Sequence, residues 1–152
     1  MKINKSVEQA VFVTLMLALQ KNHTPVKSVV LSKKLGVSDS YLKKILRQLV
    51  VAGLVKSNAS KDGGYQLAKS IEDITLYDVY EAVESKQFTY TSAELARNLF
   101  SNEEHIKQSE QKIINAFEKG FNDFDNQLKQ LFLSELLEEG KYENGWIEWD
   151  KE

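Results

Sequence analysis

The stretch of sequence from Ser28 to Leu67 constrains the fold of this chain more than any other part. Its first half holds two helical patterns, over residues 29–35 and 39–52, with a glycine between them. Gly36 suits the left-handed conformation that ends many helices, and Ser38 can accept a hydrogen bond from a free backbone N–H at the start of the second helix. Two short helices joined by so tight a turn predict a helix-turn-helix.

The second half of this stretch has the pattern of a β-hairpin. Residues 54–57 and 65–68 alternate apolar and polar side chains, and Gly53 separates the first run from the preceding helix. The pair Asp62-Gly63 stands before the second run, and Asp-Gly pairs favour hairpin turns. A hairpin directly after a helix-turn-helix predicts a winged helix-turn-helix, which is a DNA-reading unit.

Helical patterns flank this unit, so the predicted fold class is mostly α with a small β wing. Apolar side chains recur at helical spacing from Val7 to Leu19 and again from Leu76 to Val83. A longer helix is expected from about residue 102 to about Leu133, continuing or restarting up to residue 138. We therefore predict four segments: a winged helix-turn-helix DNA-binding domain (1–85), a linker (86–101), a dimerisation helix (102–138) and a C-terminal tail (139–152).

Charge is divided unevenly along the chain, although the formal net charge at pH 7 is only −2. Residues 1–70 contain twelve Lys or Arg and three acidic residues, whereas residues 71–152 contain eight Lys or Arg and nineteen acidic residues. The N-terminal part is therefore basic and the C-terminal part acidic. A basic region of this kind suits a polyanion such as double-stranded DNA, because phosphate neutralisation supplies much of the affinity.

The second helix of the predicted helix-turn-helix has one basic face. Four of its residues follow the spacing i, i+3, i+4 and i+7 and so share this face: Ser40, Lys43, Lys44 and Arg47. Ser38 and Ser40 place small hydrogen-bonding groups in the first turn, where such a helix meets bases and phosphates. A solvated basic helix face is the ordinary alternative, but the hairpin and the basic region favour DNA binding.

The predicted wing gives a weaker signal for DNA. Lys56 and Lys61 could lie along phosphates, and the tip from Asn58 to Asp62 could enter a minor groove. Asp62 cancels part of the charge of Lys61, and an ordinary hairpin turn could have the same sequence.

The predicted long helix carries an apolar stripe that needs a partner surface. Its main members are Ile106, Ile113, Phe117, Phe121, Phe124 and Leu128. The elements of the head fill one core by themselves, so we expect the stripe to pair with the same helix of a second chain in a homodimer. The long helix or the aromatic tail could instead bind an enzyme, and the chain would then be a protein-interaction module that regulates this partner without binding DNA.

The sequence contains no recognisable catalytic or metal site. It has no cysteine, and His23 and His105 are its only histidines. We find no activated serine and no phosphate-binding loop, so we predict neither an enzyme nor a cofactor or metal. We also find no signal-type apolar block and no run long enough to cross a bilayer, and we expect a cytoplasmic protein without a membrane partner.

Aromatic residues of the second half leave room for an effector pocket. The candidates are Phe88, Tyr90, Phe100, Trp146 and Trp149. They could line a site between the basic head and the long helix, although plain packing is the more common role of such side chains.

Several runs of this sequence together resemble a known family. The runs are Gly36-Val37-Ser38-Asp39-Ser40-Tyr41-Leu42, Ala52-Gly53-Leu54-Val55, Gly63-Gly64-Tyr65-Gln66-Leu67 and Ile74-Thr75-Leu76-Tyr77-Asp78-Val79-Tyr80-Glu81-Ala82-Val83-Glu84. With these residues the chain resembles the Rrf-type (IscR/NsrR/CymR-like) bacterial transcription regulators. The resemblance is close over about residues 3–85 and looser over the long helix.

The resemblance implies a winged helix-turn-helix head, a long crossed dimerisation helix and a homodimer on a pseudo-palindromic operator. It also implies DNA contacts by residues of the second helix, including Tyr41 and Lys43. Position 43 is acidic in some members, so the preferred operator should differ here, and we expect a sequence-specific regulator that represses transcription sterically. The complete predicted DNA-binding set is Ser28, Ser38, Ser40, Tyr41, Lys43, Lys44, Arg47, Lys56 and Lys61.

Two departures from the family pattern affect the expected function. Many members have an Arg-Gly-Pro-Gly-Gly-Gly-Tyr run whose arginine enters the minor groove, whereas this chain has Ala59-Ser60-Lys61-Asp62-Gly63-Gly64-Tyr65, with Lys61 as a partial substitute. Many members also hold an iron–sulfur cluster through three cysteines before the long helix, and this chain has no cysteine. Iron–sulfur and thiol sensing are therefore excluded, and a signal would have to come from a small-molecule or protein effector, if there is one.

Overall fold

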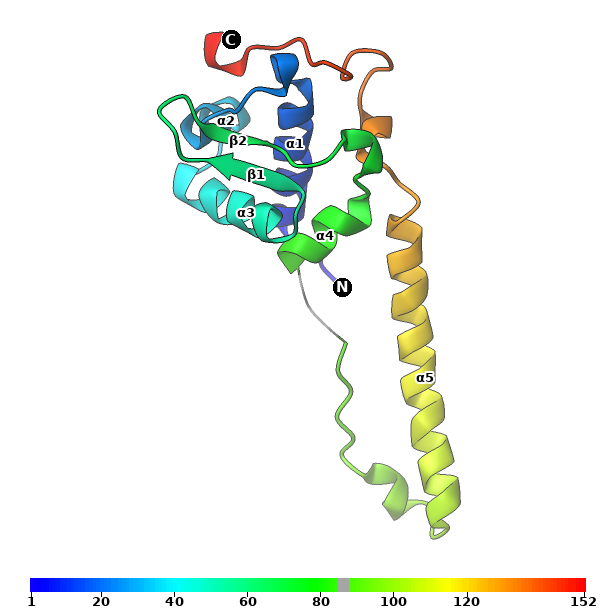
Figure 1. The fold of residues 1–152 in the computed structure, drawn as a ribbon. Coiled ribbons are helices and arrows are strands. Elements are labelled where there is room, and N and C mark those ends of the chain that lie inside the picture. Colours follow the sequence, from blue (N-terminus) through cyan, green and yellow to red (C-terminus); the bar gives the residue numbers. More distant parts are fainter. Residues whose placement is uncertain (85–87) are drawn as a thin grey trace. The chain divides into compact units, whose positions relative to one another are not determined.

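The computed structural model describes residues 1–84 and 88–152 (Figure 1). The chain divides into a head unit, Met1–Ser85 with Leu128–Glu152, and a helix unit, Lys86–Gln127. The described elements confirm the predicted fold class, because they are mainly helical with one small sheet. The helices are α1 (Lys5–Leu19), α2 (Ser28–Leu35), α3 (Asp39–Val51), α4 (Leu76–Glu84) and α5 (Glu103–Leu128), the strands are β1 (Val55–Asn58) and β2 (Gly64–Leu67), and the short 3₁₀ helices are η1 (Lys21–His23), η2 (Ile71–Asp73), η3 (Leu95–Asn98), η4 (Leu133–Leu136) and η5 (Trp149–Lys151).

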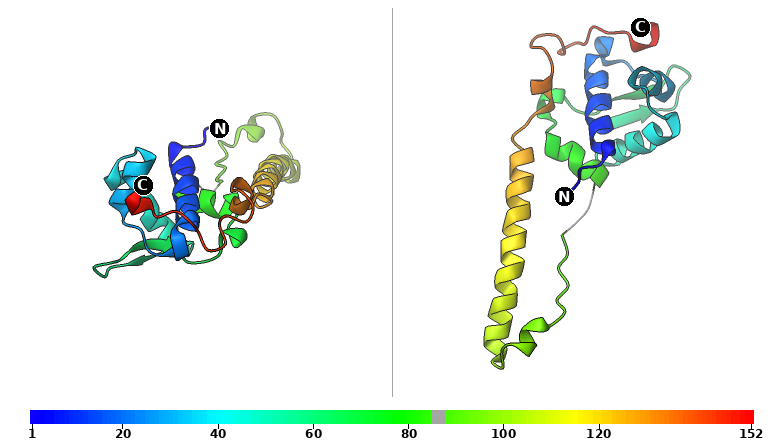
Figure 2. Two further views of the ribbon diagram at one scale, coloured as in Figure 1. Left: turned by 90° about the horizontal axis from the view of Figure 1, so that it is seen from above. Right: turned by 180° about the vertical axis from the view of Figure 1, so that it is seen from behind.

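α1 is the central element of the head unit. It packs against α3, α4 and β2, and ten of its fifteen residues are buried. The views in Figure 2 show this helix running through the middle of the head. The sequence predicts one buried stripe, and the structure also buries Val13, Met16 and Leu17, because neighbours cover α1 on several sides.

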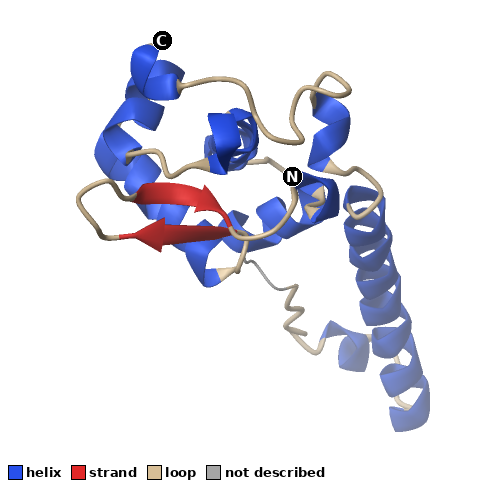
Figure 3. Cartoon of the chain, turned by 45° about the horizontal axis from the view of Figure 1, so that its top comes forward, coloured by secondary structure: helices blue, strands red, loops and turns tan. Residues whose placement is uncertain are grey.

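The wing is an antiparallel pair of strands with Val55 opposite Leu67 (Figure 3). Tyr65 also exchanges two backbone hydrogen bonds, of 2.8 and 2.9 Å, with Val26 in the segment before α2. Gly64 permits this close approach, since a Cβ atom there would lie 2.5 Å from the backbone of Val26. The wing is thereby attached to the start of the helix-turn-helix.

α5 ends at Leu128, so the predicted helix to residue 138 is too long. Beyond it, the first residue of α4 donates its backbone N–H to the Leu131 carbonyl at 2.8 Å, and Leu133 donates to the Ile74 carbonyl at 2.9 Å. The Leu133 side chain is fully buried in the core of the head. A continued helix would use these backbone groups internally, which explains the early end.

The last part of the chain lies on the head, and we call residues 131–152 the strap. It passes over the end of α1 that leads into α2 (Figures 1 and 2). Two aromatic residues of the strap, Tyr142 and Trp149, pack against the core of the head. Trp146 differs from them and remains 57% exposed.

The helix unit contains α5 and the segment that precedes it. Phe88 packs on α5, with its ring centre 5.6 Å from that of Phe117 and 5.0 Å from that of Phe121. The Ser92 hydroxyl donates a hydrogen bond of 3.1 Å to Glu110 of α5. The part of the predicted linker that the structure describes is therefore in contact with the long helix. Among the described residues, no helix has both the length and the apolar character needed to span a membrane.

Candidate nucleic-acid interface

α2, Gly36 and α3 form the helix-turn-helix. Gly36 ends α2 in the left-handed conformation, with a φ of +71°, as the sequence predicts. The Ser38 hydroxyl caps α3 by accepting a hydrogen bond of 3.4 Å from the backbone N–H of Tyr41. It also lies 3.0 Å from the Ser40 hydroxyl. This cap fixes the first turn of α3, where both serines and Tyr41 are exposed.

α3 has one buried face and one exposed face. Its buried residues are almost completely shielded from solvent: Leu42, Ile45, Leu46 and Leu49. At 100° per residue, Ser40, Lys44 and Arg47 lie on the opposite side, and all three are exposed. The burial of the apolar residues therefore sets the rotation of α3 and presents this predicted polar and basic face to solvent.

Lys43 lies at the edge of this face and pairs with Asp39, with 3.3 Å between Nζ and Oδ2. The Ser32 hydroxyl donates to the other oxygen of this carboxyl group at 3.3 Å. Partial desolvation raises the pKa of Asp39, but hydrogen bonds from Ser28 and Ser32 and the charge of Lys43 outweigh it, so the pKa lies below its ordinary value. An exposed ion pair of this kind is weak, and Lys43 can exchange it for another anion.

Ser28 differs from the other predicted DNA contacts because its side chain is only 8% exposed. It is the first residue of α2, and Lys27 occupies the cap position without a side-chain cap bond. Its side chain is one of the groups whose hydrogen bonding lowers the pKa of Asp39 in α3. The structure thus places this side chain between α2 and α3 and does not present it to solvent.

The wing presents Lys56 on β1 and Lys61 in its loop, and both are exposed. The loop is longer than a two-residue Asp-Gly turn. It is stabilised by a 3.0 Å hydrogen bond from the Ser60 N–H to Asn58 Oδ1 and a 2.9 Å bond from the Gly63 N–H to the Ser60 carbonyl. A side chain at position 63 would meet the Asn58 carbonyl, so a glycine is needed there.

A groove of about 750 Å³ lies between α3 and α4, next to the basic face. Lys44 and Arg47 line it together with Val51 of α3 and Glu81 of α4. Val51 is 81% exposed, and it is not among the predicted DNA-binding residues. A signal was present, since Val51 follows Arg47 by four residues and so extends the exposed face of α3 with an apolar side chain.

The predicted apolar stripe lies along α5, but only part of it is buried. Ile106 is buried, and Phe124 and Leu128 are half-buried. Ile113, Phe117 and Phe121 remain 45%, 50% and 38% exposed. Phe88 covers two of these rings only in part, so the described residues of the chain leave a large apolar surface open along this helix.

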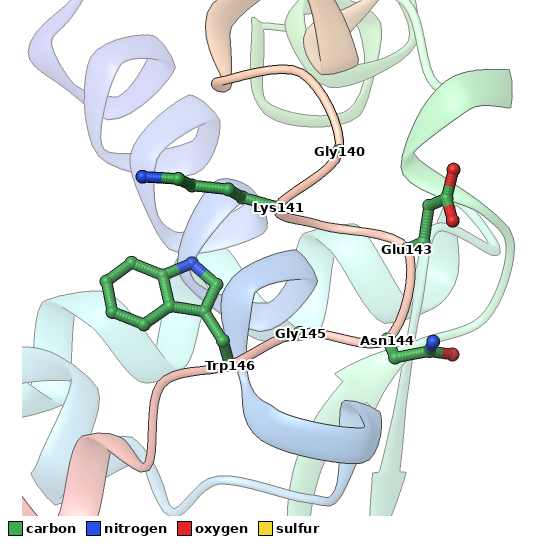
Figure 4. A pocket seen from close by; sticks show the side chains of 6 residues that line it. All are labelled: Gly140, Lys141, Glu143, Asn144, Gly145 and Trp146. Carbon is green, nitrogen blue, oxygen red and sulfur yellow. The ribbon is translucent and has the colours of Figure 1, made fainter.

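The aromatic residues considered for an effector pocket are divided between the two units. Phe88 and Phe100 belong to the helix unit, whereas Trp146 and Trp149 belong to the strap of the head unit. Trp146 lines a pocket of about 360 Å³ formed by the strap itself, shown with its neighbouring Lys141 in Figure 4. Packing accounts for Phe88 and Trp149.

Comparison with known proteins finds relatives among transcriptional regulators. YwgB of Bacillus subtilis (strain 168), which is named provisionally as an HTH-type transcriptional regulator, is 44% identical over 105 residues, covering 69% of this chain and 67% of its own. YffB of Lactococcus lactis subsp. lactis (strain IL1403), with the same kind of name, is 35% identical over 142 residues, or 93% and 90% of the two chains. The solved structure of T. potens IscR has the same fold, with a TM-score of 0.60, 24% identity and coverage of 90% and 85%.

A family model described as "Rrf2: Iron-dependent Transcriptional regulator" matches residues 3–139, so residues 140–152 lie outside the match. The residues of this chain do not fit an iron centre. The chain has no cysteine, and the residues described include no group of three or more His, Cys, Asp or Glu that could hold a metal ion. The relatives are regulators and not enzymes, which agrees with the predicted lack of catalysis. With a match over most of its length and relatives of this identity, the chain belongs to the Rrf2 family of DNA-binding transcriptional regulators.

Proposed function

We propose that this chain acts in the cytoplasm as a homodimeric repressor on a pseudo-palindromic operator. The observation that carries the proposal is the exposed face of α3, whose rotation is fixed by the burial of four leucine and isoleucine side chains on its other side. Two such helices in successive major grooves would read two half-sites. The bound dimer would block transcription by occupying the DNA.

Residues of α3 divide into those suited to bases and those suited to phosphates. Ser38, Ser40 and Tyr41 are exposed in the first turn and offer short hydrogen-bonding groups to base edges. Lys43 and Arg47 bring positive charge one and two turns further along, where Arg can bind guanine through two hydrogen bonds. Lys44 lies beside Arg47 at the groove toward α4 and suits a phosphate.

The wing contributes charge more than base recognition. Lys56 and Lys61 are exposed and can contact phosphates on either side of a groove. The wing has no arginine that could enter a minor groove, and Asp62 weakens the local positive potential. Base recognition is therefore assigned to α3.

The stripe of α5 is the proposed dimer interface. Exposed aromatic and aliphatic side chains in a row along one helix mark an interaction surface. A second copy of the chain offers the same stripe, and twofold pairing would cover both at once. The proposed interface residues are the exposed Ile113, Phe117 and Phe121, with the half-buried Phe124 and Leu128 beside them. Ile106 also belongs to the predicted stripe, but it is buried within its own chain and is not available to a partner.

We also propose that any signal received by this regulator is a small molecule or a protein partner. The residues do not fit iron, and the chain has no thiol to oxidise. The mechanism therefore includes no metal-dependent or redox step.

Selection of genomic DNA tests the proposal. The purified chain is incubated with fragmented DNA of its host at moderate salt, and the bound fragments are sequenced. A set of fragments that share an inverted repeat is the expected result. A triple variant, Lys43→Ala, Lys44→Ala and Arg47→Ala, should lose this selection.

The matched control removes three positive charges from α5 instead, with Lys107→Ala, Lys112→Ala and Lys119→Ala. It changes the net charge equally and should still select the same fragments. Unselective binding by the native chain, or selection by the α3 variant, would contradict the proposal. Capture of an enzyme by the native chain without DNA selection would favour a protein-interaction module.

A further inference from the structure

The turn between α1 and α2, residues 20–27, is held by the strap as well as by its own neighbours. The backbone N–H groups of Lys21 and Asn22 donate to the carbonyls of Ile147 and Asn144, each at 2.7 Å. These bonds join segments about 120 residues apart in sequence. The strap therefore supplies hydrogen-bond partners for backbone groups that follow the end of α1.

This turn contains two consecutive residues in a left-handed backbone conformation. Asn22 has a φ of +56° and His23 a φ of +52°. Residues other than glycine adopt this conformation only where their surroundings hold them in it. Nε2 of His23 lies 3.1 Å from the Tyr142 carbonyl, which is a further contact with the strap. The strap thus contacts both left-handed residues of this turn.

The same turn leads directly into the parts of the head that are proposed to meet DNA. Val26 lies in it and pairs with Tyr65 of β2, and α2 begins immediately after it at Ser28. A change in the turn would therefore move the wing and the first helix of the helix-turn-helix at the same time.

Trp149 anchors the end of the strap on three elements. Its indole N–H donates to the Met16 carbonyl of α1 at 2.7 Å, and its backbone N–H donates to Gln20 Oε1 at 3.2 Å. The ammonium group of Lys34 in α2 lies 6.0 Å from its ring centre. This one residue of the strap therefore contacts α1 and the turn and lies beside Lys34 of α2.

The strap beyond η4 is held mainly by these contacts. No residue after Leu133 is buried, and Trp146 is largely exposed. Segments with few buried apolar groups open locally at a lower free energy than the core. Residues 140–152 also lie outside the residues that the family model matches.

We propose that the strap is a latch on the DNA-binding head. When docked, it holds the turn before α2 and keeps the wing and α2 in the arrangement that binds DNA. When it is released, the turn relaxes and DNA affinity falls. This inference rests on the proposed binding of DNA by α3 and the wing.

Two glycines of the strap, both labelled in Figure 4, allow a matched test. Gly145 has a φ of +64°, and a Cβ atom there would lie 1.9 Å from the Gln20 carbonyl oxygen. Gly140 has a φ of +78°, but a Cβ atom there meets nothing within 4 Å. Gly145→Ala should therefore prevent docking, whereas Gly140→Ala introduces the same kind of backbone strain without a clash.

The measurements are amide hydrogen exchange of the full chain and its affinity for the selected operator. Gly145→Ala should speed exchange at residues 19–28 and lower affinity about tenfold, while Gly140→Ala stays within about twofold of the native chain. Trp149→Ala is the second release variant and should behave like Gly145→Ala.

Faster amide hydrogen exchange at the turn in the release variants, with unchanged operator affinity, would overturn the proposal of a latch. Loss of protection throughout α3 would also overturn it, because the strap would then be needed for folding of the head. Unchanged exchange and affinity in both release variants would show that the turn does not depend on the strap. A native chain that selects no DNA would instead refute the proposed function, while hydrogen exchange would still report on the turn.

Discussion

α3 and α5 both carry a clear apolar stripe, yet the described chain covers only one of them. The stripe of α3 is almost completely shielded from solvent by α1, α2, α4 and β1. Along α5, Ile106 is buried, but Ile113, Phe117 and Phe121 remain between 38% and 50% exposed. The two helices thus have similar sequence patterns and different surroundings.

This difference shows what helical periodicity can and cannot predict. Spacing tells which side chains of a helix share a face and prefer to leave water. It does not tell whether the surface that covers them belongs to the same chain. For α3 the cover is the head itself, and for α5 we propose a second copy of the chain.

The strongest way to break the comparison is Phe117→Asp in α5. A carboxylate in the middle of the proposed interface would be buried without a partner, and it should weaken dimerisation about a thousandfold, or roughly 4 kcal/mol. The mass measured by light scattering should fall from twice 17.4 kDa to 17.4 kDa. Asn126→Asp places the same charge on the polar side of α5 and should leave the mass unchanged. An unchanged mass for Phe117→Asp would refute the interface.

Leu46→Ala in α3 should have the next largest effect. Leu46 is completely buried, so the change leaves a cavity and should lower the free energy of unfolding by about 3 kcal/mol. The matched change Ile113→Ala, measured in urea at concentrations where the chain is monomeric, should cost less than about 1 kcal/mol because this side chain is half exposed. Equal losses in the two variants would mean that α5 is covered within its own chain.

On the exposed side of α3, Arg47→Ala should reduce operator affinity by about 1–3 kcal/mol and relax the preference at one base pair. Lys61→Ala in the wing should weaken all DNA sequences alike and reduce the slope of log affinity against log salt by about 1. Titrations of the operator and of a scrambled site at several salt concentrations separate the two effects. Identical behaviour of both variants would contradict the division between base reading and phosphate contact.

The smallest effect is expected from Asp39→Asn at the edge of α3. The pKa of Asp39 is below its ordinary value in the folded chain, so its charged form adds stability above pH about 4, and this contribution disappears as the pH falls through the folded pKa. The variant should therefore be slightly less stable than the native chain at pH 7, and the difference should shrink as the pH falls below about 4. A stability difference that is independent of pH would show that the ionised carboxylate is not responsible.

Most of the head could be predicted from sequence because its signals are local. Gly36 and Ser38 determine the end of α2 and the cap of α3 through the conformations and hydrogen bonds available to them, and the structure confirms both. The predicted hairpin is confirmed as well, although its loop is longer than a two-residue Asp-Gly turn. The apolar spacing of α3 correctly predicts its buried face and hence its exposed one. Family membership and the role as a transcriptional regulator follow from the same residues and are confirmed by the relatives.

The contacts that the sequence did not reveal are between distant segments. α5 stops at Leu128 because the following residues bond to the segment before α4, and helical spacing up to Leu131 gives no sign of this. Ser28 belongs to the predicted DNA-binding set, but its side chain is only 8% exposed. The left-handed residue Asn22 donates its backbone N–H to the Asn144 carbonyl, near the other end of the chain.

The attachment of Tyr65 to Val26 has a consequence for the kinetics of DNA recognition. Ordering one residue of a flexible backbone costs about 1–2 kcal/mol of conformational entropy, and in this chain the strands of the wing lose that freedom during folding. This entropic cost is not incurred again when the protein binds DNA, so it does not reduce the affinity for DNA. The rate of association should then depend on charge and orientation, without a slow step in which the hairpin takes shape on the duplex.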